Sequence, residues 1–205
     1  DLKEFFEVSK NLYNQSLWTI KQHYKERGEY LNYNALDKIM KETKNLENEI
    51  NYKLLPAQTS QQILKLLDKN FKSFFKSIKD YEKNPSKYLG KPKPPKYKSR
   101  YNLLIYTNQN SKIDLINRAI KLSKISQPIV IPKSVFTMDF KEYKQIWLLP
   151  KRDHIKIEIV YETEIRNEDL DYSLFASIDL GVNNLIAMIT NTGNQPILIN
   201  GKIIK

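Results

Sequence analysis

Apolar side chains recur with a helical period over the first part of the chain. In residues 2–26 they fall at three- and four-residue spacing, which predicts a long helix. Gly28 follows directly and is typical of a helix end. Residues 32–43 predict a shorter helix that Asn34 could cap. Residues 57–83 have the strongest helical period and predict a second long helix.

The helix predicted at residues 57–83 has two distinct faces. Its apolar stripe consists of Ile63, Leu67, Phe71, Phe74, Ile78 and Tyr81. Its opposite face carries Lys65, Lys69, Lys72, Lys76, Lys79 and Lys83. Carboxylates are sparse beside these lysines, since Asp68 is the one carboxylate between Lys65 and Lys79, and Asp80 follows next. Such a face is either simply solvated or contacts a polyanion, and we favour contact with nucleic acid.

The next stretch, residues 84–102, excludes a helix because it contains Pro85, Pro92, Pro94 and Pro95. From Lys83 to Arg100 there are seven basic residues and no acidic one. Three tyrosines are interleaved with them: Tyr88, Tyr97 and Tyr101. A flexible basic linker is one interpretation. We favour a nucleic-acid contact, because lysines neutralise phosphates, tyrosines stack on bases, and a stiff polyproline-like chain presents both.

The period changes to two after residue 102. Five or six short strands over residues 103–166 predict a small antiparallel barrel or sandwich. Residues 167–173 are polar and acidic and predict a linker. Residues 174–205 predict three antiparallel strands joined by tight turns, with Asp179 inside the first apolar run. A strand in a sheet would hold such a carboxylate rigidly, as a metal-dependent nuclease requires.

Charge and composition narrow the classes of function. The net charge is +11, and residues 51–100 alone carry 13 basic and 3 acidic side chains, a net charge of +10. There is no cysteine, and His23 and His154 lack the spacing of metal ligands. No apolar run approaches the ~20 residues that span a bilayer. We therefore expect no membrane partner and a cytoplasmic, nucleoid-associated setting. Because the helical pattern starts at once and without Met, we also expect the chain to belong to a longer protein.

Four motifs carry a resemblance to a known family. "SIDLGVNNLIAMIT" (residues 177–190) resembles the first nuclease motif of the TnpB (OrfB) family, transposon-encoded relatives of type V CRISPR effectors. "LPAQTSQQILKLLDKNFKSFFKSIK" resembles the helical recognition segment of that family. "GKPKPPKYKSRYN" resembles its basic segment before a β-rich wedge domain, and "AIKLSKISQPIVIPK" lies where the family has a similar β segment.

The resemblance implies a prokaryotic RNA-guided DNA endonuclease that holds a guide RNA, reads a short motif beside its DNA target and cleaves with Mg²⁺. The implied fold class is α+β. It comprises a helical recognition region (1–83), a basic segment with a wedge-like β-barrel (84–168), and the first three strands of an RNase H-like (RuvC) sheet (169–205).

The resemblance and the charge pattern together give the candidate site residues. Asp179 matches the first catalytic carboxylate and would be a magnesium ligand. Polar residues that could contact nucleic acid, a glutamine by reading a base edge, are Gln58, Ser60, Gln61 and Gln62. The basic and aromatic candidates are Lys65, Lys69, Lys72, Lys76, Lys91, Lys93, Lys96, Tyr97, Lys98 and Arg100.

The chain also departs from the family pattern. Residues 180–205 contain no Asp or Glu, the zinc-binding cysteines are absent, and no strand precedes the helical region. We therefore expect this polypeptide to hold no magnesium and not to cut DNA. Two alternatives stay open: a nuclease-dead RNA-guided DNA-binding protein or transposition regulator of the same ancestry, and an unrelated basic RNA-binding barrel. Apolar strand edges at residues 174–205 also suggest a homodimer.

Overall fold

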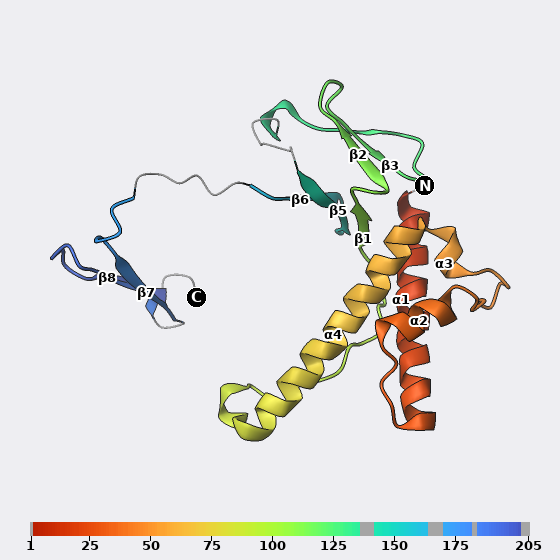
Figure 1. The fold of residues 1–205 in the computed structure, drawn as a ribbon, viewed down its shortest axis with the longest axis horizontal. Coiled ribbons are helices and arrows are strands. Elements are labelled where there is room, and N and C mark those ends of the chain that lie inside the picture. Colours follow the sequence, from red (N-terminus) through yellow and green to blue (C-terminus); the bar gives the residue numbers. More distant parts are fainter. Residues whose placement is uncertain (1, 136–141, 164–169, 182–183, 202–205) are drawn as a thin grey trace. The chain divides into compact units, whose positions relative to one another are not determined.

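The computed structural model describes residues 2–135, 142–163, 170–181 and 184–201 (Figure 1). The chain divides into two compact units, Asp1–Thr163 and Glu164–Lys205. Within the described residues the fold combines four α-helices with three antiparallel sheets of three strands each. The predicted α+β class is confirmed at this level. The predicted boundary at residue 83 lies inside the first unit, and the boundary at residue 169 lies outside the described residues.

The helices of the first unit lie close to their predicted positions. They are α1 (Leu2–Arg27), α2 (Tyr33–Met40), α3 (Asn51–Leu54) and α4 (Ala57–Lys83). The two long helices, α1 and α4, cross and pack together (Figure 1). Gly28 ends α1 in a left-handed conformation, φ +70°, and its N–H donates to the Tyr24 carbonyl at 2.8 Å.

The predicted cap of α2 was wrong by two residues. Asn32 has extended backbone dihedrals, and its side chain accepts a hydrogen bond from Ala35 N at 3.1 Å. Asn34 lies inside the first turn of α2 instead. Asn32 therefore makes the contact that an N-cap asparagine provides, satisfying a backbone donor at the helix start.

One hydrophobic core joins the helices to the first two sheets. The predicted α4 stripe contributes Ile63, Leu67 and Phe71, which are buried, and Phe74, which is half-buried. Buried residues from other elements include Phe6, Leu12, Leu17, Leu36, Leu104, Tyr106, Ile120, Leu122, Ile146 and Leu148. Each buried leucine contributes about 2 kcal/mol through the hydrophobic effect. This packing, more than helix propensity, holds α1 and α4.

A buried carboxylate also holds α4 against the chain that enters α2. Asp68 accepts hydrogen bonds from the Tyr30 hydroxyl at 2.9 Å and from Tyr33 N at 3.2 Å. Its second oxygen pairs with Lys72 Nζ at 2.7 Å. Burial and the hydrogen bond to Asp68 raise the pKa of Tyr30 above its ordinary value. The carboxylate is thus compensated from three directions, as burial requires.

The strands of the first unit form two separate sheets. Strands β1 (Leu104–Thr107), β5 (Tyr143–Pro150) and β6 (Ile155–Tyr161) pair in the order β1-β5-β6. Strands β2 (Ser111–Asp114), β3 (Ala119–Leu122) and β4 (Ile129–Val130) pair in the order β2-β3-β4. The short strands were predicted, but no ladder among the described residues joins the two sheets into a closed barrel. Among the described residues each of these strands pairs only within its own sheet, so both sheets stay open.

The second unit contains one sheet, β7 (Ala176–Leu180), β8 (Asn184–Thr190) and β9 (Ile197–Asn200). The three predicted antiparallel strands are therefore present. Their burial was not as expected, because β7 is exposed along its whole length. Large apolar residues that stay exposed on this sheet are Ile178, Leu180, Leu185, Ile189, Ile197, Leu198 and Ile199. The predicted linker, residues 167–173, lies partly outside the described residues.

None of the described helices combines the length and apolar character needed to cross a membrane.

Candidate nucleic-acid interface

The lysines predicted on α4 do not form one uniform face. Lys65, Lys69, Lys72 and Lys76 are all exposed. Two of them also build the fold, because Lys72 pairs with Asp68 and Lys65 Nζ lies 5.4 Å from the centre of the Tyr33 ring. Among the described residues neither Lys69 nor Lys76 makes an ion pair. These two lysines are therefore the α4 candidates whose charge is least engaged within the protein.

The polar residues at the start of α4 lie mostly inside the protein. Ser60 is fully buried, and its hydroxyl donates to the Tyr52 carbonyl at 2.8 Å. The prediction that Ser60 contacts nucleic acid was therefore wrong, because its one donor is used in helix packing. Gln58, Gln61 and Gln62 are half-buried. Their helix turn docks on the β region through Thr59, whose hydroxyl oxygen accepts a hydrogen bond from Asn110 Nδ2 at 3.0 Å.

The basic segment, defined here as residues 91–101, runs against α1 and is held by hydrogen bonds. Asn14 binds both backbone groups of Lys98: its Oδ1 accepts from Lys98 N at 2.8 Å, and its Nδ2 donates to Lys98 O at 2.9 Å. Just beyond the segment, Asn102 N donates to the Phe6 carbonyl at 3.4 Å. Ser9 donates its hydroxyl to Leu103 O at 2.8 Å. The stretch predicted as nucleic-acid-contacting is thus anchored at its C-terminal end.

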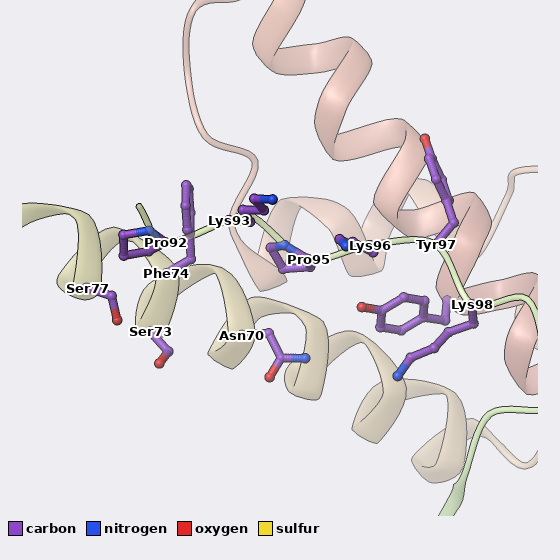
Figure 2. Close-up of a pocket in the computed structure, with 11 residues that line it drawn as sticks. Asn70, Ser73, Phe74, Ser77, Pro92, Lys93, Pro95, Lys96, Tyr97 and Lys98 are labelled. Atoms are coloured by element: carbon purple, nitrogen blue, oxygen red, sulfur yellow. The ribbon is translucent and has the colours of Figure 1, made fainter. Parts of the chain in front are cut away.

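A groove lies between the basic segment and α4, with a volume of about 480 Å³. Figure 2 shows the segment passing alongside α4, with Ser77, Ser73 and Asn70 following one another on the facing helix. We call it the lysine groove; its lining residues are Tyr13, Asn70, Ser73, Phe74, Ser77, Pro92, Lys93, Pro95, Lys96, Tyr97 and Lys98. Three lysines and no carboxylate line it, so its charge favours an anion.

The lysine groove also offers aromatic rings and neutral hydrogen-bonding groups. The Tyr97 side chain is 48% exposed, and Lys21 Nζ lies 4.3 Å from the centre of its ring. The side chain of Lys98 extends over Tyr13, with Nζ 5.4 Å from that ring centre. Burial raises the pKa of the Tyr13 hydroxyl, so this group stays neutral. A partly exposed tyrosine beside several cations is the combination by which proteins bind single-stranded nucleic acid.

The three interleaved tyrosines differ in what they can do. Tyr97 and Tyr101 are each about half-exposed, and the Tyr101 ring packs 6.2 Å from that of Phe6. Tyr88 makes its contacts within the protein, because its hydroxyl donates to Asp80 at 2.8 Å and its ring packs against Tyr81. This hydrogen bond lowers the pKa of the Asp80 carboxyl and raises that of Tyr88. Only Tyr97 and Tyr101 therefore remain as stacking surfaces.

All five cations predicted on the basic segment are exposed. They are Lys91, Lys93, Lys96, Lys98 and Arg100. In polyproline-like backbone each residue advances about 3.1 Å, so the four lysines, which precede the bend at residues 99–100, lie about 6–9 Å apart along the chain. No acidic residue occurs from Lys83 to Ile113 to neutralise them locally. The segment therefore presents a row of positive charges with a fixed anchor at Lys98.

Asp179 lies on β7, opposite Ala187 of β8 in the sheet register. The residue is exposed, so its carboxylate is not the buried group that the apolar run suggested. The other described carboxylate of this unit, Asp171, accepts hydrogen bonds from the backbone N–H and the hydroxyl of Ser173. Over the described part of the chain no cluster of three or more His, Asp or Glu side chains could hold a metal ion. These residues do not fit a two-metal nuclease centre.

No family model matches the chain, and no curated protein matches it.

Several groove residues escaped the sequence prediction, namely Tyr13, Asn70, Ser73 and Ser77, as did Lys21, which contacts the Tyr97 ring. They come from α1 and α4, far in sequence from the basic segment. Asn70, Ser73 and Ser77 each follow a lysine of α4 directly and form a strip of polar, uncharged side chains beside the lysines. That strip was the signal that could have found them, since small residues allow a second chain to approach a helix closely.

Replacing Asn14 tests whether α1 anchors the basic segment. Asn14→Ala removes both hydrogen bonds to Lys98, which together contribute about 1–3 kcal/mol to local order. We expect trypsin to cleave at Lys96 and Lys98 several-fold faster, because proteolysis follows local opening. The rate is measured by mass spectrometry of timed digests. Asn11→Ala, exposed on the same helix, is the control; equal cleavage rates in the two variants would contradict the anchor.

Proposed function

We propose that the first unit binds nucleic acid along the lysine groove and the basic segment. The observation that carries this proposal is the groove itself. Three lysines, the half-exposed Tyr97 and small polar side chains line it, and no carboxylate does. Lysines bind phosphate oxygens without regard to sequence, and an aromatic ring stacks on any base. Asn70, Ser73 and Ser77 add neutral hydrogen-bonding groups to the same surface.

The family resemblance supports a more specific form of this function. We propose that the chain is the nucleic-acid-binding part of a TnpB-like, RNA-guided DNA endonuclease in a prokaryotic cytoplasm. Its partners would then be a guide RNA and a target DNA with a short adjacent motif. A wedge-like β region and an RNase H-like sheet belong to the same proposal, with Asp179 as the first catalytic carboxylate of a magnesium site that the described residues do not complete.

The nuclease-dead alternative has its own observation in support. Over the described residues no carboxylate cluster accompanies Asp179. An RNA-guided protein that binds DNA without cutting it, acting as a repressor or regulator of transposition, needs no such cluster. An unrelated basic RNA-binding protein also accounts for the lysine groove, but not for the motif around Asp179. The three hypotheses share nucleic-acid binding and differ in the guide and in the chemistry.

Removing the charge of the basic segment tests the proposed binding. The variant replaces Lys91, Lys93, Lys96, Lys98 and Arg100 with Ala. If each cation contacts one phosphate, the slope of log affinity against log salt falls in magnitude by about 3.5 for single strands and 4.5 for duplex DNA. Fluorescence anisotropy at several salt concentrations measures both affinity and slope.

The matched control removes five exposed lysines outside the segment: Lys25, Lys38, Lys44, Lys53 and Lys133. It changes the net charge equally, so it separates local contacts from general attraction. We expect only a small loss of affinity and little change of slope. An unchanged slope in the segment variant, or equal losses in both variants, would show that the segment is only a linker.

Cleavage assays test the expectation for Asp179. The 205-residue polypeptide, incubated with Mg²⁺ and plasmid or oligonucleotide DNA, is expected to leave the DNA intact. One described carboxylate cannot hold two ions about 4 Å apart. Magnesium-dependent cleavage that disappears in Asp179→Ala but persists in Asp171→Ala would refute this expectation and establish a metal centre.

Self-association through the second unit is also part of the proposal. The edge strands β7 and β9 carry exposed Ile178, Leu180 and Leu198, and unpaired apolar edges readily pair with another copy. We expect sedimentation velocity to detect a concentration-dependent dimer that Leu198→Lys shifts to monomer. Gln195→Lys adds the same charge in the preceding turn as a control. A monomer at every concentration would exclude this homodimer.

A further inference from the structure

A second hollow continues the basic segment beyond the lysine groove. It has a volume of about 720 Å³ and lies where the chain turns between β5 and β6. We call it the hairpin hollow; its lining residues are Glu7, Ser99, Arg100, Tyr101, Lys151 and Arg152. Lys151 and Arg152 are separated from Arg100 by about fifty positions in the sequence. Only the fold brings these three cations to one place.

The charges of the hairpin hollow favour an anion. Arg100, Lys151 and Arg152 are exposed cations. Glu7 is the one carboxylate among the lining residues, and it already pairs with Lys10. Asp153, which follows Arg152 in the turn, contacts the ring nitrogen Nδ1 of His154 at 2.7 Å. Two guanidinium groups and an ammonium group beside one engaged carboxylate suit a phosphate, which arginine binds through paired N–H donors.

The turn that carries two of these cations is defined by its own backbone. Lys151 N donates to His154 O at 2.8 Å, closing the connection between β5 and β6. The two strands pair over their length, from Tyr143 with Tyr161 to Pro150 with Ile155. Side-chain substitutions at Lys151 and Arg152 leave this backbone bond in place. The hollow is therefore supported by a folded hairpin and not by an isolated loop.

The hollow also contains a surface for a base. Tyr101 is 46% exposed and packs against Phe6 on one side. Tyr97, in the adjacent lysine groove, is exposed to a similar extent. The two tyrosines are four residues apart, and the chain bends at residues 99–100 between them. Bases paired in a duplex cannot reach such rings, whereas unpaired bases stack on them.

From this arrangement we propose that the hairpin hollow binds a backbone phosphate of a single-stranded polynucleotide, with an unpaired base stacked on Tyr101. The strand follows the basic segment from the lysine groove into the hollow. Arg100, Lys151 and Arg152 neutralise its phosphate there. This inference rests on the proposed nucleic-acid binding and adds to it a second site, a strand type and two residues from the β region.

The test measures binding of the full chain to fluorescent single-stranded RNA and DNA oligonucleotides and to the matching duplexes. Lys151→Ala/Arg152→Ala is expected to weaken single-strand binding about tenfold, because it removes charge-assisted hydrogen bonds to phosphate. The salt slope should fall in magnitude by about 0.7, the value for the one phosphate that the hollow is proposed to neutralise. Arg152→Ala alone should give about half of that change in slope. Duplex binding is expected to change less.

Two further variants distinguish binding in the hairpin hollow from a general effect of net charge and test the stacking ring by itself. Lys144→Ala/Lys156→Ala removes two cations of the same hairpin that pair with Glu142, Glu158 and Glu162, and should leave binding nearly unchanged. Tyr101→Leu removes the stacking ring but no charge, so it should lower single-strand affinity without changing the salt slope.

The outcomes distinguish the two proposals. If the wild-type chain binds no nucleic acid, the proposed function itself fails. If the five-residue segment variant has a smaller salt slope but Lys151→Ala/Arg152→Ala does not, only the hairpin hollow fails. If Lys151→Ala/Arg152→Ala lowers the affinity for single strands and for duplexes equally, the proposed preference of the hollow for single strands is wrong. Comparison of RNA with DNA shows which polynucleotide the site takes.

Discussion

The hydrogen bonds between α1 and the chain at residues 98–103 determine where the proposed binding surface forms. A proline-rich chain has few backbone donors and no internal hydrogen bonds, so its path must be fixed by side chains from elsewhere. Asn14 provides this at Lys98, and Ser9 provides it at Leu103. The same contacts lead the chain into β1, whose Leu104 and Tyr106 are buried in the shared core. The position of the basic segment and the docking of the first sheet thus depend on one seam.

The position of that seam explains why the lysines lie outside. Asn14 takes up the backbone groups of Lys98, so the side chain of Lys98 is left to extend over Tyr13. Pro92 and Pro95 face α4 and are half-buried, while Lys91, Lys93 and Lys96 between and beside them are exposed. Pro92 and Pro95 therefore supply the packing surface of the segment, and the lysines, together with Pro94, its solvent surface. A sequence without this alternation would bury charge against α4, at a high energetic cost.

Much of the local structure could be predicted from the sequence, because it depends on near neighbours. The periods of α1 and α4, the glycine that ends α1 and the short strands are all local patterns. Asn32 and Asn34 are equally good caps by residue type, and only the backbone dihedrals separate them. Whether five or six strands close into a barrel depends on pairings between distant segments. The sequence does not specify these pairings.

The residues of the candidate site likewise include some that the sequence could predict and others that it could not. The exposed row from Lys91 to Arg100 was predictable, since charge density in an extended chain is a local property. The role of Ser60 was not, because its partner, the Tyr52 carbonyl, belongs to another helix. Lys151 and Arg152 escaped prediction because two cations in a turn are commonplace until the fold places them beside Arg100. Residues that act through a distant partner are the ones that sequence patterns miss.

The basic residues therefore have two separate uses. Lys72 compensates Asp68, and Lys124 donates to the last carbonyls of α3, at Lys53, Leu54 and Leu55; these cations stabilise the fold. The cations of the basic segment repel one another instead, since no carboxylate lies among them. A bound polyanion would relieve this repulsion and strengthen the seam at Asn14 at the same time. On the proposed function, binding of a polyanion and ordering of the segment would be coupled, because the charged residues belong to the same stretch of chain that Asn14 anchors.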